Sequence, residues 1–144
     1  MKRIIFVLSI ISFSFPTFSQ GINDYIEKGI AAYDQSDFEG AIKNYKKALE
    51  INANSELANY EIALTYFAMQ NYKMAIEHGE TVVKMNGENL IPVYILVGSA
   101  LDNSGQTEES IKLFKKAIKK TEGHYLLYYN LGLNYYKIGD RENT

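Results

Sequence analysis

The amino-acid sequence predicts an all-α fold, a stack of helical hairpins. Two observations predict it. Small residues recur with a period of 34 or 35 positions, and the apolar residues within each period follow the spacing of amphipathic helices. The near absence of Pro agrees with this fold, because Pro interrupts helix interiors and the 144 residues include only two, Pro16 and Pro92.

Three series of small residues share the period and one inserted residue, which falls between positions 86 and 90. A small side chain in the middle of a helix allows a second helix to approach closely, so the series predict repeated helix–helix contacts. The members are Gly29, Ala63, Gly98 and Gly132; Ala41, Ala75, Ser110 and Thr144; and Ala48, Val82 and Ala117.

Residues 21–144 are taken as one domain. The period divides this domain into units of about 22–55, 56–90 and 91–124, followed by a partial unit 125–144. Each complete unit has two amphipathic segments and is predicted to form two helices. We expect a turn at equivalent places between the helices, with Asp37, Asn71 and Asp140 capping the helix that follows. The predicted turns are Ser36-Asp37, Gln70-Asn71, Gly105-Gln106 and Gly139-Asp140.

Residues 1–20 have the layout of a secretory signal peptide. Lys2 and Arg3 precede an apolar stretch of about 12 residues, whereas a membrane-spanning helix needs roughly 20. Pro16 follows, and small residues then favour cleavage after Ser19 or Gln20. We therefore expect an exported protein, periplasmic or secreted. An uncleaved membrane anchor is the alternative.

Composition argues against several classes of function. A formal charge of −2 is a poor match for nucleic acid phosphates, and the chain contains no Cys. His78 and His124 are the only histidines and form no HExxH pattern, while the glycines are scattered at repeat positions and not gathered in a phosphate-binding loop. We expect no catalytic residues, no metal, no cofactor and no nucleic acid partner.

Two stretches resemble the tetratricopeptide repeat (TPR). Residues 128–140, YYNLGLNYYKIGD, match the first half of its pattern, and residues 37–52, DFEGAIKNYKKALEIN, match the second half. The resemblance implies a right-handed superhelical stack that binds proteins. Two features depart from the pattern: the late Pro is missing from every unit, and Gly79 replaces the usual aromatic residue. Gly79 is expected to loosen its helix, because Gly costs about 1 kcal/mol relative to Ala.

The resemblance also implies a concave groove lined by the first helix of each unit. The positions implied are apolar or aromatic, with Ser99 and Asp102 as polar neighbours. Some TPR proteins clamp a terminal carboxylate with basic residues, and no such set is present here. An apolar helix or extended segment of a protein partner fits better, although individual rings could instead pack between neighbouring helices. The groove residues are Ile26, Ile30, Tyr33, Tyr60, Leu64, Phe67, Ile95, Tyr129, Leu133 and Tyr136.

The sequence thus leads to an exported scaffold for protein–protein interaction. The alternative is a sensory or docking segment at the N-terminus of a larger protein that carries an enzymatic or regulatory domain. Neither the partner nor the oligomeric state is visible in the sequence.

Overall fold

The computed structural model of the chain describes residues 18–87 and 90–142, and within these ranges it contains seven helices and no strand. The helices are α1 (Phe18–Asp34), α2 (Phe38–Ile51), α3 (Glu56–Ala68), α4 (Tyr72–Met85), α5 (Leu90–Asn103), α6 (Thr107–Lys120) and α7 (Tyr125–Glu142). The predicted all-α fold is confirmed.

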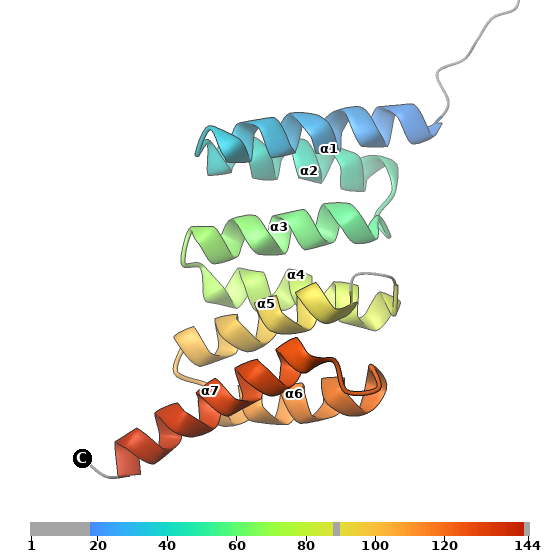
Figure 1. The fold of residues 1–144 in the computed structure, drawn as a ribbon. Coiled ribbons are helices and arrows are strands. Elements are labelled where there is room, and N and C mark those ends of the chain that lie inside the picture. Colours follow the sequence, from blue (N-terminus) through green and yellow to red (C-terminus); the bar gives the residue numbers. More distant parts are fainter. Residues whose placement is uncertain (1–17, 88–89, 143–144) are drawn as a thin grey trace, which may run out of the picture.

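Consecutive helices pack against each other along the whole chain, from α1 with α2 to α6 with α7. Figure 1 shows the resulting stack, with α1 and α2 at one end and α7 at the other. The buried residues of the core fall into three clusters along this axis, centred on Tyr45, Val97 and Phe114. Each cluster joins neighbouring helices, as expected for a repeat protein in which a unit contacts only its neighbours.

The stack is closer-packed on one side than on the other. The first helices of successive hairpins contact each other, α1 with α3, α3 with α5 and α5 with α7. In the described part of the chain, the second helices α2, α4 and α6 make no such contacts with one another. A stack that is compact on one side curves toward that side, so the first helices form the concave surface.

The turns inside the three complete hairpins follow the predicted register. Ser36, Gln70 and Gly105 occupy equivalent positions and all have positive φ, at 62°, 59° and 85°. Asp37 then caps α2, because its Oδ1 accepts a hydrogen bond from the Gly40 backbone N–H at 2.9 Å. Oδ1 of Asn71 accepts from the Met74 backbone N–H in the same way at 3.3 Å.

The turn predicted at Gly139-Asp140 is wrong. Helix α7 continues through both residues to Glu142, so Asp140 begins no new helix. Within the described residues no further helix packs against this part of α7. By continuing as a helix, the chain keeps its backbone N–H and C=O groups hydrogen-bonded, whereas a turn would leave some of them without partners. Nothing in the described structure offers other partners for these groups.

Most of the small residues that the structure describes have the predicted packing role. Gly132 does not, because a Cβ added there would meet no atom within 4 Å, and Thr144 lies outside the described residues. A Cβ added at Gly29 would lie 2.6 Å from Cδ1 of Tyr45, and one at Gly98 would lie 2.6 Å from Cε2 of Phe114. Each glycine therefore makes room for an aromatic ring from the following helix. In the second hairpin Gly79 stands where Tyr45 stands in the first; it is buried, and Val97 of α5 fills the space beside it. Gly79 thus serves helix packing, which the sequence pattern alone did not indicate.

The predicted signal peptide falls mainly on residues 1–17, which lie outside the described residues, and α1 begins at Phe18. None of the helices in the described ranges is long and apolar enough to cross a membrane.

Candidate functional site

The concave surface contains an apolar hollow of about 410 Å³ between α3, α5 and the start of α7. Its lining side chains come from three first helices, and Ser99 is the polar one among them. The lining residues are Tyr60, Leu64, Phe67, Ile91, Pro92, Ile95, Leu96, Ser99 and Leu126.

Helix α3 supplies one wall of the hollow. Tyr60, Leu64 and Phe67 are spaced by four and three residues, which places them on a single helix face. The Phe67 ring packs edge-on against Tyr72 of α4, with centroids 5.6 Å apart. This contact holds the ring in place at the border of the hollow.

Helix α5 supplies the opposite wall through Pro92, Ile95 and Ser99, again with helical spacing. Pro92 lies in the first turn of α5, as predicted, where its missing N–H breaks no helical hydrogen bond. Leu126 of α7 completes the lining near the beginning of that helix. The hollow therefore depends on how α7 is held against α5.

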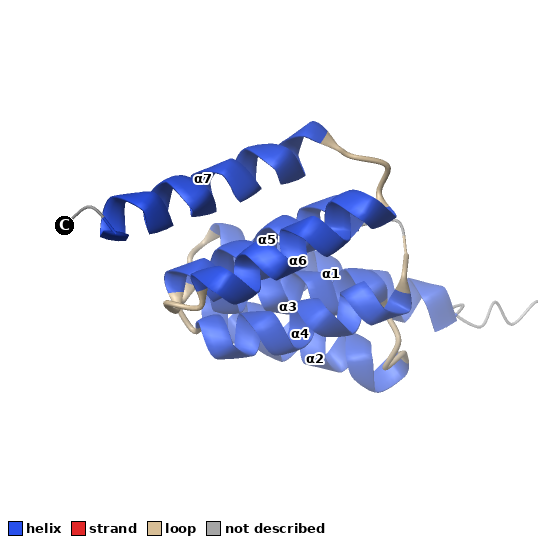
Figure 2. Ribbon diagram, turned by 90° about the horizontal axis from the view of Figure 1, so that it is seen from below, coloured by secondary structure: helices blue, strands red, loops and turns tan. Residues whose placement is uncertain are grey.

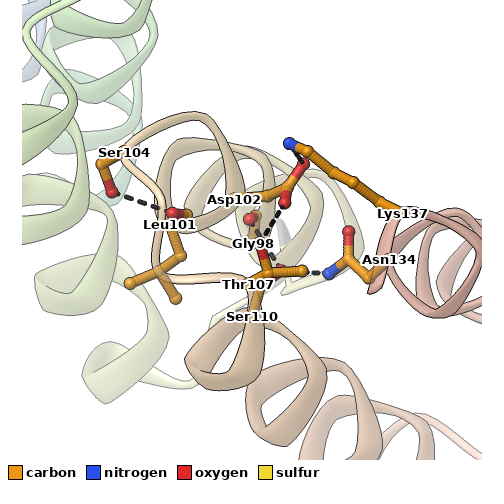
Figure 3. Close-up of polar contacts among 8 residues, drawn as sticks. All are labelled: Gly98, Leu101, Asp102, Ser104, Thr107, Ser110, Asn134 and Lys137. Atoms are coloured by element: carbon orange, nitrogen blue, oxygen red, sulfur yellow. Dashed lines mark hydrogen bonds and ion pairs between the residues drawn. The ribbon is translucent and has the colours of Figure 1, made fainter. Parts of the chain in front are cut away.

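A polar junction holds α7 in position (Figure 3). The Asn134 side chain donates to Oγ of Ser110 at 2.6 Å, and that hydroxyl donates to the Gly98 carbonyl at 2.8 Å. Asn134 and Ser110 are both buried, so this relay links α7, α6 and α5 inside the protein. Lys137 adds an ion pair with Asp102 at 2.8 Å. The register of α7 is thus set by directional contacts as well as by packing of Leu127.

Half-buried titratable groups lie beside the hollow on α3. Burial raises the pKa of Tyr60, with smaller contributions from Glu61 and Tyr33. Burial also raises the pKa of the Glu61 carboxyl, and the negative charge of Asp34 adds to this effect. Among the described residues, no positively charged side chain lines the hollow. The surroundings therefore favour an apolar occupant and offer no cation to an acidic one.

The structure places nine of the ten predicted groove residues in three groups and buries the tenth, Ile26, in the core. Tyr60, Leu64, Phe67 and Ile95 line the hollow. Ile30, Tyr129, Leu133 and Tyr136 are exposed outside it, and Tyr33 is half-buried against Phe38 at the end of α1.

Ile26 requires a correction, because it is only 4% exposed and belongs to the core cluster around Tyr45. Its side chain is used to pack α1 against its neighbours. It is therefore not available to a partner in the groove.

Ile91, Pro92, Leu96 and Leu126 line the hollow and were not predicted. Two of them could have been found from the period: Leu57, Pro92 and Leu126 are separated by 35 and 34 residues and lie one helical turn before Tyr60, Ile95 and Tyr129. Ile91 and Leu96 carry no such signal, since their contribution depends on how α5 is rotated in the stack.

Comparisons with known proteins agree with the geometry of the stack. A sequence model described as "TPR repeat" matches residues 29–70, and one described as "Tetratricopeptide repeat" matches 57–89 and 91–119. The chain belongs to the tetratricopeptide-repeat family. The two TPR models together cover more than half of the chain, and their matches span α1 to α6.

Among curated proteins, a TPR repeat-containing protein of Methanocaldococcus jannaschii is 28% identical over 125 residues, which are 85% of this chain and 22% of that protein. The chain thus spans less than a quarter of the length of this relative. Among solved structures, the N-terminal domain of stress-induced protein-1 from C. elegans has a TM-score of 0.75 at 17% identity, covering 83% of this chain and 98% of that domain.

A third similar protein is the first TPR of Spaghetti, solved with the HSP90 peptide SRMEEVD. Its TM-score is 0.72 at 19% identity, with 84% of this chain and 98% of that chain covered. At this level of identity the likeness concerns the fold alone, which is the TPR superhelix.

Proposed function

We propose that this TPR chain is a scaffold that binds a segment of another protein in the hollow between α3, α5 and α7. The observation that carries the proposal is an open, apolar concavity formed by Tyr60, Leu64, Phe67 and Ile95. Apolar side chains gathered in a concave site favour an apolar ligand, because binding removes both surfaces from water. The Spaghetti TPR, which shares this fold, is bound to a peptide.

The chemistry of the hollow favours an apolar or aromatic segment over an acidic one. SRMEEVD, the peptide in the Spaghetti structure, carries several carboxylates. In the part of the chain that the structure describes, no Lys or Arg lines the hollow, and Glu61 lies beside Tyr60. A buried carboxylate from the ligand would therefore have no cation to pair with, at considerable cost. A helix or extended segment with two or three large apolar side chains matches the hollow better.

The proposal includes export to the periplasm or the medium, on the strength of the sequence of residues 1–20. N-terminal sequencing of the protein recovered from the envelope fraction and from the medium tests this part. A mature chain that begins at Gln20 or Gly21 is expected. Protein found only in the cytoplasm with Met1 intact would refute export without affecting the binding proposal.

Site-specific photo-crosslinking in the producing cells tests the binding proposal. A photo-reactive phenylalanine analogue at Ser99 lies in the hollow, whereas the same analogue at Lys46, exposed on α2, is the control. We expect a discrete adduct from position 99 that is lost when Leu64→Ala and Phe67→Ala are combined. Equal adducts from both positions, or an adduct that survives the double substitution, would refute the groove as the binding site.

A further inference from the structure

Two carboxylates lie where α1 meets α3, next to the hollow. Asp34 is the last residue of α1, and Glu61 of α3 directly follows Tyr60, which lines the hollow. Helix α3 contacts α1 on one side and α5 on the other (Figure 1), so this junction and the hollow are neighbours along the concave surface. We call Asp34 and Glu61 the acidic pair.

The acidic pair has no cation of its own. Neither carboxylate forms an ion pair with another described residue. Burial raises the pKa of Glu61, the charge of Asp34 raises it further, and no positive charge of the described residues opposes this. Lys28 and Lys47 lie instead over the Tyr25 ring, 5.5 Å and 5.4 Å from its centre. Tyr25 is about 14 Å from Asp34 along α1, so these two lysines serve another place.

The repeat shows that apolar residues can fill the equivalent positions. Leu96 is the counterpart of Glu61 in the third unit, where it packs in the core and is 6% exposed. Phe114 is the counterpart of Tyr45, and both rings cover the glycine of the preceding helix. The Tyr45 hydroxyl is nevertheless buried without a hydrogen-bond partner among the described residues. A buried carboxylate and a buried unpartnered hydroxyl both cost stability, which Leu and Phe avoid.

These costly polar groups meet at one place. Burial raises the pKa of Tyr45, and the charges of Glu61 and Asp34 raise it further, so the buried hydroxyl lies close to both carboxylates. Tyr33 of α1 and Tyr60 of α3 are half-buried and belong to the same group. Local departures from the most stable choice of residue are typical of functional sites.

We propose that the acidic pair binds a lysine or arginine side chain of the segment that occupies the hollow. This inference rests on the proposed function and adds a requirement for positive charge to it. The aliphatic part of such a side chain can lie along the rings of Tyr60 and Tyr33 while its cationic end reaches Glu61 and Asp34. The cation offsets the repulsion between the two carboxylates.

The chain contains an example of the same chemistry at the junction of α5 and α7. There Oδ2 of Asp102 pairs with Nζ of Lys137 at 2.8 Å, and Oδ1 of Asp102 accepts a hydrogen bond from the Thr107 hydroxyl at 2.8 Å. An acidic side chain of a first helix thus pairs with a lysine where one is within reach. At the junction of α1 and α3 the described residues supply no such lysine, so the cation comes from another segment.

The position of the acidic pair favours a partner protein as the source of that segment. Figure 2 views the stack from the α7 end, with the hairpin of α1 and α2 farthest from α7. In a repeat stack a unit contacts only its neighbours, so a helix following α7 would pack beside α7 and not at the junction of α1 and α3. The basic residues Lys2 and Arg3 of the chain itself are the competing source and are included in the test.

NMR titrations of the isotopically labelled chain with synthetic peptides test the inference. The probes are acetylated, amidated peptides with Leu and Phe at fixed positions and either Lys, Gln or Glu at one further position, which is moved along the peptide. We expect shifts at Leu64 and Ile95 in the hollow with all three kinds, and at Glu61 with the Lys peptide. The Lys peptide should bind about tenfold more tightly than the Gln peptide, and high salt should reduce this advantage.

Glu61→Gln separates binding from stability. This variant should lose the advantage of the Lys peptide although its melting temperature rises, because a half-buried charge is removed. A residue with a merely structural role would not change the preference for Lys over Gln. Glu50→Gln is the matched control: it removes the same charge at an exposed position of α2 and should leave the preference unchanged.

Four results would overturn the inference. Equal binding of the Lys and Gln peptides, with shifts in the hollow, would refute the charge requirement and leave the proposed function standing. Absence of shifts from the hollow as well as from Glu61 would refute both. A preference for Lys that survives Glu61→Gln would place the cation elsewhere. A rise in affinity of about tenfold when Lys2→Gln and Arg3→Gln are combined in the full chain would show that its own N-terminal residues occupy the acidic pair.

Discussion

Replacing Gly98 and Gly132 separately with Ala should change stability in opposite directions, although the two residues occupy the same place in the repeat. A Cβ at Gly98 would lie 2.6 Å from Cε2 of Phe114, well inside the 3.4 Å at which ordinary contact begins. The ring belongs to the core and is 1% exposed, so moving it disturbs its neighbours. Overpacking of this kind costs about 1–3 kcal/mol, and the upper end applies to a rigid ring.

Replacing a helix-interior Gly with Ala also stabilises the helix by about 1 kcal/mol. For Gly98→Ala, the cost of overpacking exceeds the gain in helix propensity, and the net effect is a decrease of about 2 kcal/mol in the free energy of unfolding. At Gly132 only the favourable contribution remains, because nothing lies within 4 Å of the added Cβ, and a gain of about 1 kcal/mol is expected. The two variants should therefore differ by about 3 kcal/mol.

Urea unfolding followed by circular dichroism measures both values, with unchanged spectra of the native variants as the control for folding. Equal effects of the two substitutions would show that helix propensity dominates. The packing of Phe114 over Gly98 would then not explain why glycine occupies this position of the repeat.

Three other substitutions test separate parts of the structure. Glu61→Gln should raise the melting temperature at pH 7. Burial raises the pKa of Glu61 above its usual 4.5, so the ionised form costs stability above the pKa of the folded state, and the advantage of Gln should vanish as the pH falls below 4.5. A constant advantage at pH 3 would contradict this. Asn134→Ala removes the hydrogen bond to Ser110, worth about 1 kcal/mol, and hydrogen exchange should accelerate in α7 while α1 to α3 keep their protection. Uniform acceleration would count against a local role. Ala75→Trp overfills a fully buried position between α3 and α4 and should lower the melting temperature by several degrees, since overpacking costs about 1–3 kcal/mol. An unchanged melting curve would exclude close packing there.

The hollow was only partly predictable. Tyr60, Leu64 and Phe67 follow from helical spacing, because three apolar residues four and three positions apart must share a helix face. Ile26 has the same apolar character and the equivalent place in its repeat, but it packs into the core around Tyr45. Which apolar residues of a first helix face solvent depends on the rotation of that helix against its neighbours, and periodicity does not determine this rotation.

The sequence by itself determined that the chain folds into paired helices and where two of the second helices, α2 and α4, begin. Helical spacing, capping residues such as Asp37 and Asn71, and small residues at a fixed period are all local or periodic properties that act before any distant contact forms. Tertiary structure decided what each repeated position does. Gly98 is covered by Phe114 while Gly132 is open, and α7 runs past the predicted turn, because a residue's role depends on whether another helix packs over it. Neighbouring helices differ from one end of a stack to the other even where the sequence repeats.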